Sequence, residues 1–311
     1  LLSVNAIGDY QSGNLVVEGY RIRGLLGGMF GNPNDLALHF VTMAPLAVGL
    51  MMASRNLLGK LLFGVIAVMA VAAITVTYSR AGFIGLLAIA SVLLWKLGRR
   101  HRLRIAILGP ICLTLFIAFA PGNYANRILS IFIPSLDAMG SRSHRQEILN
   151  RSVLVSLRWP ITGVGMGNFA AVSLGETVTH NAFTQVSAEM GITALVVYMM
   201  FLTGPLRGLR RMERETFNLR PQTHYYYLAI GLQVSLIGYM VSGFFASVAY
   251  QWYAYYLVGY AVCLRRMYEA DERTSTEITA QAASPPVADQ HVGRHHAPAL
   301  WPPGTRHSSL R

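Results

Sequence analysis

One histidine in this sequence stands immediately before a long apolar run, in the segment "THNAFTQVSAEMGITAL". His180 is followed by Asn181, and Glu189 lies within the first turns of the run. A neutral imidazole, whose ordinary pKa is about 6.5, can accept a proton from a hydroxyl group near neutral pH. The carboxylate of Glu189 can bind hydroxyl groups of a ligand, or it can pair with an arginine inside the protein. We therefore interpret His180, Asn181 and Glu189 as candidate site residues.

Several arginines also lie beside apolar segments. Arg80 stands in "TYSRAG" between two apolar runs, Arg142 and Arg145 open "SRSHRQEILNRSVLVSLRW", and Arg23 precedes "GLLGGMFGNPNDLALHF". The planar guanidinium group suits phosphate, and an ionisable residue at a membrane surface is a candidate for function. Together these arginines fit a lipid-linked diphosphate, although anionic lipid headgroups satisfy the same side chains. Arg80 alone also fits a helix-end arginine that extends to lipid phosphate.

The segment "GNPNDLALHF" carries a helix start. Asn residues accept hydrogen bonds from free amides at such a start, and Pro33 suits a first turn. Asn34 and Asp35 are explained equally well by simple capping and by a functional role. For His39, one turn into the helix, the sequence favours a packed, hydrogen-bonded histidine.

The composition of the 311 residues indicates an integral membrane protein. Hydrophobic residues make up 53% and charged residues 13%, against about 25% charged residues in soluble domains. The net charge of +12 is explained by basic cytoplasmic loops of a membrane protein, so we expect no nucleic-acid partner. Cys112 and Cys263 lie inside apolar runs, and no metal-ligand spacing occurs. We therefore expect no metal and no cofactor.

Apolar segments long enough to cross a bilayer predict the fold. A span requires roughly 20 mostly apolar residues, and spans of this kind must be helical. Seven segments qualify: 36–53, 58–78, 81–97, 104–120, 182–206, 225–246 and 250–264. The predicted fold class is an all-α integral membrane protein, a multispanning helical bundle.

The basic loops orient these spans. Lys and Arg gather in four places that fall on one side, which the positive-inside rule makes cytoplasmic. The start of the chain looks like the end of an earlier apolar segment, so we expect an N-terminally incomplete bundle. The predicted organisation is a periplasmic segment over 1–35, four spans over 36–120, a periplasmic loop with an amphipathic helix over 121–181, three spans over 182–266 and a disordered cytoplasmic tail over 267–311.

Four segments, in this order, resemble the O-antigen ligase and O-antigen polymerase superfamily, which includes protein O-oligosaccharyltransferases. They are "GLLGGMFGNPNDLA", "TVTYSRAGFIGL", "HRQEILNRSVLVSLRWPITGVGMGNF" and "THNAFTQVSAEMGITAL", and the resemblance extends over about residues 20–265. It implies a GT-C-like bundle in the bacterial inner membrane. It also implies inverting, metal-independent transfer of a glycan from undecaprenyl diphosphate on the periplasmic face.

The resemblance gives roles to individual residues. Arg80 and Arg145 would hold the diphosphate, and His180 would act on the acceptor hydroxyl as a base or an orienting group. Arg23 and Asn34 match an upstream region with a binding role. The family often has an aromatic residue, commonly Trp, where this chain has Leu149. Stacking of an aromatic ring on sugar is therefore not expected at that point.

The acceptor is not determined by these motifs. Lipid A–core, another lipid-linked glycan and a protein hydroxyl all fit, and ligation to lipid A–core is the commonest reaction. From a different class, a transporter of lipid-linked glycans predicts polar residues at mid-membrane and inverted repeats. Neither feature is evident, since 58–77 and 104–120 are nearly free of charge. The expected partners are thus the lipid-linked donor, the acceptor and membrane lipids.

Overall fold

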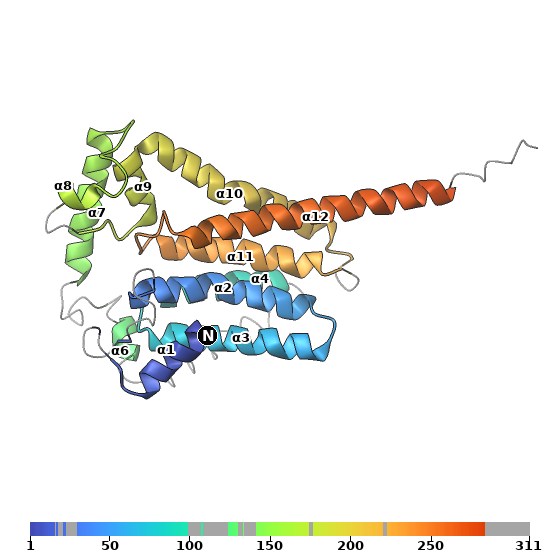
Figure 1. Ribbon diagram of the computed structural model, residues 1–311. Helices are drawn as coiled ribbons and strands as arrows, with labels where there is room; N and C mark the ends of the chain where they lie inside the picture. The colour runs from blue at the N-terminus through green and yellow to red at the C-terminus, as the bar shows by residue number, and fades with distance from the viewer. Residues whose placement is uncertain are drawn as a thin grey trace, which may run out of the picture. The chain divides into compact units, whose positions relative to one another are not determined.

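The computed structural model describes residues 1–15, 17, 21–22, 30–98, 107, 124–129, 133, 141–173, 177–219 and 223–283. In these ranges the chain is helical, and its one β-bridge joins Val17 and Arg21. The helices are α1 (Leu2–Gln11), α2 (Pro33–Ala53), α3 (Leu57–Val76), α4 (Arg80–Leu97), α6 (Tyr124–Leu129), α7 (Ser141–Arg158), α8 (Phe169–Val172), α9 (Ala182–Met190), α10 (Ile192–Glu215), α11 (Tyr225–Gly243) and α12 (Trp252–Ala283) (Figure 1).

Five of these helices, α2, α3, α4, α10 and α11, are long and apolar enough to cross a membrane. The prediction of a multispanning helical membrane protein is confirmed at this level. Of the seven predicted spans, 104–120 lies outside the described residues apart from Ile107. The predicted span 250–264 falls in the first half of α12, which is not among the five candidates.

The predicted single span over 182–206 is wrong, because a break at Gly191 divides it into α9 and α10. Gly191 has a φ of +91°, which side chains rarely permit. The backbone of Ile161 also lies so close that a Cβ atom at Gly191 would clash with it. The Ile192 amide donates a hydrogen bond of 2.7 Å to the Pro160 carbonyl. An earlier segment of the chain therefore occupies the position that a continuous helix would need.

The predicted disordered tail over 267–311 also begins too early, because α12 continues to Ala283. Its sequence there is polar but contains good helix formers, and Arg265 pairs with Glu269 one turn along the helix. The polar composition of this segment did not exclude a helix, because a helix surrounded by solvent needs no apolar face. Residues 284–311 lie outside the described ranges. The packing below concerns residues 1–269, which form one compact unit.

Short polar caps define the starts of several helices. At each cap, a side-chain oxygen accepts a hydrogen bond from a backbone amide of the first turn, as is usual for Asn and Ser. The caps are Asn32 for α2, Asn56 for α3, Ser79 for α4 and Asn181 for α9. The connections before α3 and α4 are only a few residues long, so α2, α3 and α4 alternate in direction.

Glycines bring α11 into close contact with α2 and α4. A Cβ atom at Gly231 would lie 3.2 Å from the Gly49 Cα atom, and one at Gly238 would lie 3.2 Å from a methyl group of Val41. Residue numbers therefore rise along α2 as they fall along α11, and the two helices are antiparallel. Gly85 near the start of α4 likewise lies against Ser242 near the end of α11. Small residues at such crossings let helices approach closely.

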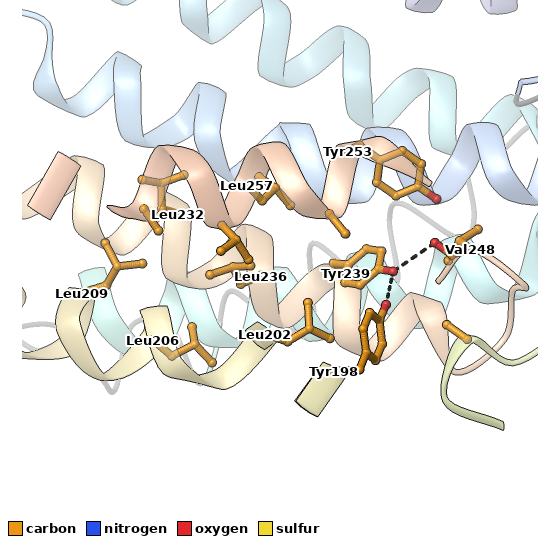
Figure 2. Packing of buried hydrophobic residues seen from close by; sticks show 14 of the residues in the cluster. Tyr198, Leu202, Leu206, Leu209, Leu232, Leu236, Tyr239, Val248, Tyr253 and Leu257 are labelled. Carbon is orange, nitrogen blue, oxygen red and sulfur yellow. Dashed lines mark hydrogen bonds between the residues drawn. The ribbon is translucent and has the colours of Figure 1, made fainter. Parts of the chain in front are cut away.

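A buried cluster joins α10, α11 and α12 on the other side of α11 (Figure 2). Leu202, Leu206 and Leu209 of α10 pack with Leu232 and Leu236 of α11. At one end of this cluster, the hydroxyls of Tyr198 and Tyr239 are 2.6 Å apart, which places the start of α10 beside the end of α11. The starts of α2, α4, α10 and α12 and the ends of α3 and α11 therefore meet at one end, called the site end below.

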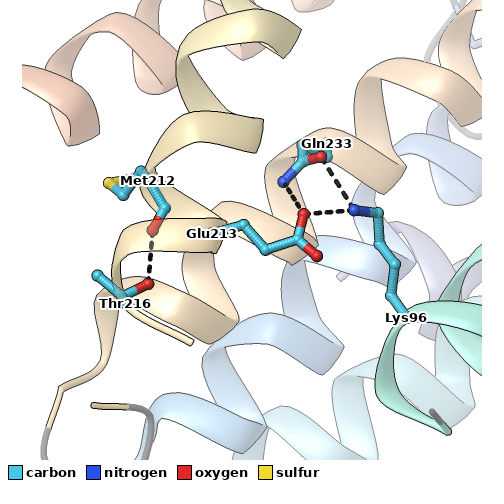
Figure 3. Close-up of polar contacts among 5 residues, drawn as sticks. All are labelled: Lys96, Met212, Glu213, Thr216 and Gln233. Carbon is cyan, nitrogen blue, oxygen red and sulfur yellow. Dashed lines mark hydrogen bonds and ion pairs between the residues drawn. The ribbon is translucent and has the colours of Figure 1, made fainter. Parts of the chain in front are cut away.

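The opposite half of the bundle holds a buried ion pair. Lys96 near the end of α4 donates to the Glu213 carboxylate on α10, and the Gln233 side chain on α11 hydrogen-bonds both groups at 3.1 and 3.0 Å (Figure 3). All three residues are buried. A charge buried in this way is tolerated when it is paired and hydrogen-bonded. This cluster links three membrane-spanning helices far from the site end.

Candidate functional site

Arg80 lies at the site end beside a buried polar cluster. Ser79, which caps α4, donates its hydroxyl to Asn34 Oδ1 at 2.9 Å, and Arg21 donates to the same oxygen at 2.9 Å. Arg21 also donates to the Thr77 carbonyl at 3.0 Å and is only 4% exposed. Asn34 thus joins the start of α2 to the turn before α4. This turn positions the half-buried Arg80 at the first helical residue of α4.

Aromatic side chains lie along the turn that carries Arg80. The hydroxyls of Tyr10 and Tyr78 are 3.3 Å apart, and Tyr124 of α6 packs edge-on against Tyr78 and Phe83. Burial raises the pKa of Tyr78 and of Tyr124, so both hydroxyls stay neutral. Tyr78 itself has a φ of +53°, a conformation that the packed rings stabilise. The turn is therefore rigidly supported on one side.

His180 is positioned by the turn between α11 and α12. Its backbone amide donates to Ser247 Oγ at 2.7 Å, and the Thr179 hydroxyl lies 3.0 Å from the same oxygen. The φ of His180 is +51°, which is uncommon for a residue other than glycine. The next residue, Asn181, uses its side-chain oxygen to cap α9. Backbone strain of this kind frequently marks a functional site.

Arg145 and His144 of α7 lie near His180. Burial lowers the pKa of His180, and electrostatic interactions with Arg145 and His144 lower it further. The imidazole is therefore held in its neutral, proton-accepting form. Helix α7 reaches this position because it packs on α9, where the hydroxyls of Ser156 and Ser187 are 2.8 Å apart.

Glu189 is engaged by the glycine-rich turn after α7. The Gly167 amide donates to the Glu189 carboxylate at 2.9 Å, and the Gly165 amide donates to the Glu189 carbonyl at 2.8 Å. The side chain is 4% exposed. The neighbouring Tyr250 has its pKa raised, first by burial and then by the Glu189 carboxylate. Glu189 therefore binds the turn that closes the end of α9.

The α11–α12 turn connects the parts of this end. Besides Ser247, its Val248 carbonyl accepts a hydrogen bond of 3.1 Å from Tyr239, and its Ala249 amide donates to Gln185 of α9 at 3.3 Å. Tyr250 of the same turn lies beside Glu189. A short turn thus contacts α9, α11 and the segment that carries His180.

The structure brings some of the predicted site residues together. His180, Asn181 and Arg145 lie in one group, and Asn34 lies beside Arg80 in a second group. Both groups are at the site end, but no described contact joins Arg80 to His180. Arg23 and the side chain of Arg142 lie outside the described residues.

Sequence reasoning included Arg23 but not its neighbour Arg21 among the candidate site residues, and it missed Ser79 and Ser247. Arg21 precedes the "NPN" segment by about ten residues, and its position so close to Arg23 was the only available signal. Ser79 carried a clearer signal, because a serine directly before a helix start is a usual cap. Ser247 had no local signal at all, since it acts on a residue 67 positions away in the chain.

Cationic and proton-accepting groups at one end of the bundle define the chemistry that is available. Arginines can bind and neutralise phosphate oxygens, and a neutral imidazole can accept a proton from an attacking hydroxyl. In the described part of the chain, no group of three His, Cys, Asp or Glu residues is arranged to hold a metal. The arrangement suits transfer of a group from a phosphate ester or diphosphate to an alcohol.

Comparison with known proteins identifies the family that this arrangement resembles. No curated protein matches the chain. Residues 65–199 match a family model described as O-antigen ligase, and this range contains Arg80, Arg145 and His180. The match supports the resemblance to the O-antigen ligase and polymerase superfamily over residues 65–199, and the five apolar helices are those expected of a multi-pass membrane protein.

Proposed function

We propose that the protein is an inner-membrane glycosyltransferase that moves a glycan from undecaprenyl diphosphate to lipid A–core on the periplasmic face. The observation that carries this proposal is the half-buried His180, kept neutral beside Arg145, at the same end of the bundle as Arg80. The family match supports a reaction of the O-antigen ligase and polymerase type, and ligation to lipid A–core is proposed as the commonest reaction of that type.

Arg80 and Arg145 bind the diphosphate in this proposal. Arg80 is at the start of α4, where free backbone amides and the helix dipole favour an anion. Negative charge grows on the diphosphate as its bond to the sugar breaks. Guanidinium groups stabilise this charge in the transition state, which makes diphosphate a good leaving group without a metal ion.

His180 acts on the acceptor. The acceptor hydroxyl attacks the anomeric carbon on the face opposite the diphosphate, and its proton passes to the imidazole. One carbon–oxygen bond forms as the other breaks, so the configuration at the anomeric carbon is inverted. Asn181 caps α9 and Glu189 binds the glycine-rich turn, and both thereby support the loop that carries His180.

The test is reconstitution of the full-length protein in liposomes without metal or nucleotide. An undecaprenyl-diphosphate glycan is supplied with purified lipid A–core, and the products are separated by gel and identified by mass spectrometry. We expect glycan on lipid A–core. Arg80→Ala, Arg145→Ala and His180→Ala should each reduce the rate by about 100-fold or more, as loss of an acid–base or charge-stabilising group does.

Arg207→Ala is the matched control, because Arg207 is an exposed arginine of α10 away from the site end. This variant should keep the wild-type rate. Retained transfer activity in all three site variants would contradict the proposed mechanism. Lengthened lipid-linked chains would identify a polymerase, a glycosylated protein acceptor would identify a protein transferase, and movement of the glycan lipid between leaflets without transfer would identify a transporter.

A further inference from the structure

Asp35 and His39 lie one turn apart at the start of α2, on the same side of the helix. The ring of His39 packs edge-on against Phe30, at 4.9 Å between centroids, and against Tyr253 of α12, at 6.3 Å. The Asp35 carboxylate is close enough to Tyr253 for its charge to act on the hydroxyl. Three hydrogen-bonding side chains therefore lie close together where the start of α2 meets the start of α12.

These groups have no hydrogen-bond partners within the described residues. Tyr253 is only 2% exposed, yet its hydroxyl contacts no donor or acceptor there, and neither does the buried Nδ1 atom of His39. No hydrogen bond or ion pair to the Asp35 carboxylate is found among the same residues. Tyr239, which packs on Tyr253, differs because its hydroxyl bonds both Tyr198 and the Val248 carbonyl.

Such a cluster is costly to the folded chain. Buried polar groups are nearly always hydrogen-bonded, and each one left without a partner destabilises the fold. A carboxylate, an imidazole nitrogen and a phenol grouped together are explained when a ligand supplies the missing hydrogen bonds. A carboxylate accepts from two hydroxyl groups, and a phenol and an imidazole each donate or accept.

We infer that Asp35, His39 and Tyr253 form a binding site for the hydroxyl groups of a sugar. The site lies next to the proposed diphosphate site, since Asp35 follows Asn34, whose side chain holds Ser79 beside Arg80. The inference rests on the proposed function for the identity of its ligand. The sugar is either the first residue of the lipid-linked donor or a residue of the acceptor.

The variants Asp35→Asn and Tyr253→Phe test the site, with Tyr239→Phe as the matched control. Removing a buried hydroxyl that has no partner, or a buried charge that has none, does not cost the protein stability. Both site variants should therefore unfold at the wild-type temperature or above it. Tyr239→Phe removes a hydroxyl with two partners and should unfold at a lower temperature, without loss of sugar binding.

Binding is measured on the full-length protein in detergent with three probes. They are undecaprenyl-diphosphate glycan, undecaprenyl diphosphate without sugar, and lipid A–core. Asp35→Asn and Tyr253→Phe should weaken binding of one sugar-bearing probe by about tenfold, the effect of losing a hydrogen bond to a charged or buried group. Binding of the sugar-free diphosphate should not weaken, and loss of the Asp35 charge beside it favours the anion. The probe that is weakened identifies the donor or the acceptor as the ligand.

Two results would overturn the inference. Unchanged affinity of both variants for both sugar-bearing probes would show that no sugar binds there. A lower unfolding temperature in both variants would show that their polar groups are internal structural partners. Because the readout is binding and not transfer, the outcome is independent of whether His180 performs catalysis.

Discussion

At the scale of single residues, the most informative side chain is His180, because its backbone, its burial and its neighbours act together. The left-handed φ of +51° turns the residue out of the path of α9, and the Ser247 hydroxyl holds its amide there. Burial and the cations of α7 keep its imidazole neutral. A base that is neutral over a wide pH range suits proton transfer from an acceptor hydroxyl.

The pH dependence of transfer follows from this environment. The pKa of His180 is lowered from 6.5, so the imidazole is unprotonated at neutral pH and is protonated only as the pH falls below 6.5. The rate of transfer should therefore be level near neutral pH and decline only at pH values under 6.5. Rates in liposomes from about pH 5 to about pH 8 check this, since this range contains the ordinary titration of histidine. A decline that begins above 6.5 would contradict the assignment.

The Arg145→Gln variant tests the electrostatic part of the same account. Arg145 disfavours the protonated imidazole, so its removal should raise the pKa of His180. NMR titration of isotope-labelled histidine follows this change even in an inactive enzyme, and a His180→Gln sample assigns the signal. A pKa that stays the same or falls in Arg145→Gln would show that the two side chains do not interact.

At the scale of elements, short turns do more to build the site than the helices do. The α11–α12 turn contacts the His180 segment and α9, and the glycine-rich turn after α7 contacts the end of α9. Each contact joins segments that are distant in the chain. The helices supply rigid ends, and the turns determine which side chains meet there.

Ser247→Ala should lower the transfer rate by about tenfold. The substitution leaves the His180 amide without its partner, at a cost of about 1–3 kcal/mol, and frees a strained residue to relax. Ser247→Thr keeps the hydroxyl and should restore most of the rate. Ser242→Ala is the control, because Ser242 is a buried serine near the end of α11 whose hydroxyl bonds no described residue. Equal rates in Ser247→Ala and the wild type would refute the positioning role.

At the scale of the whole molecule, the two halves of the bundle carry different tasks. The site end contains Arg80, Arg145 and His180, together with polar groups of α2 and α12 that have no partner among the described residues. The opposite half contains the paired cluster of Lys96, Glu213 and Gln233, which connects α4, α10 and α11. A buried ion pair thus links three helices at a distance from the candidate site residues.

Lys96→Met should be strongly destabilising, since it leaves the Glu213 carboxylate buried without its cation. Breaking a buried pair in this way costs about 3–5 kcal/mol. The double variant Lys96→Met, Glu213→Gln removes both charges and should recover most of the loss. Thermal unfolding in detergent measures both effects, and the protein that remains folded should keep its transfer rate. A Lys96→Met variant as stable as the wild type would contradict this role for the pair.

The sequence by itself determined the features that depend on near neighbours in the chain. Apolar runs of sufficient length predicted the helices α2, α3, α4 and α11, because a helix forms all of its backbone hydrogen bonds within its own segment. Caps such as Asn32 were readable for the same reason. The order of the motifs around Arg80, Arg145 and His180 indicated a resemblance to a family whose model matches residues 65–199.

Only the tertiary structure decided the features that depend on distant contacts. Gly191 ends α9 because the backbone of residues 160 and 161 lies against it. No local sequence pattern predicts this contact. Ser247 supports His180 from 67 residues away, and His39 and Tyr253 lie in contact only because the packing brings the starts of α2 and α12 together. Hydrophobic periodicity predicts which side of a helix is apolar. Which other helix packs against that side depends on the packing of the whole bundle.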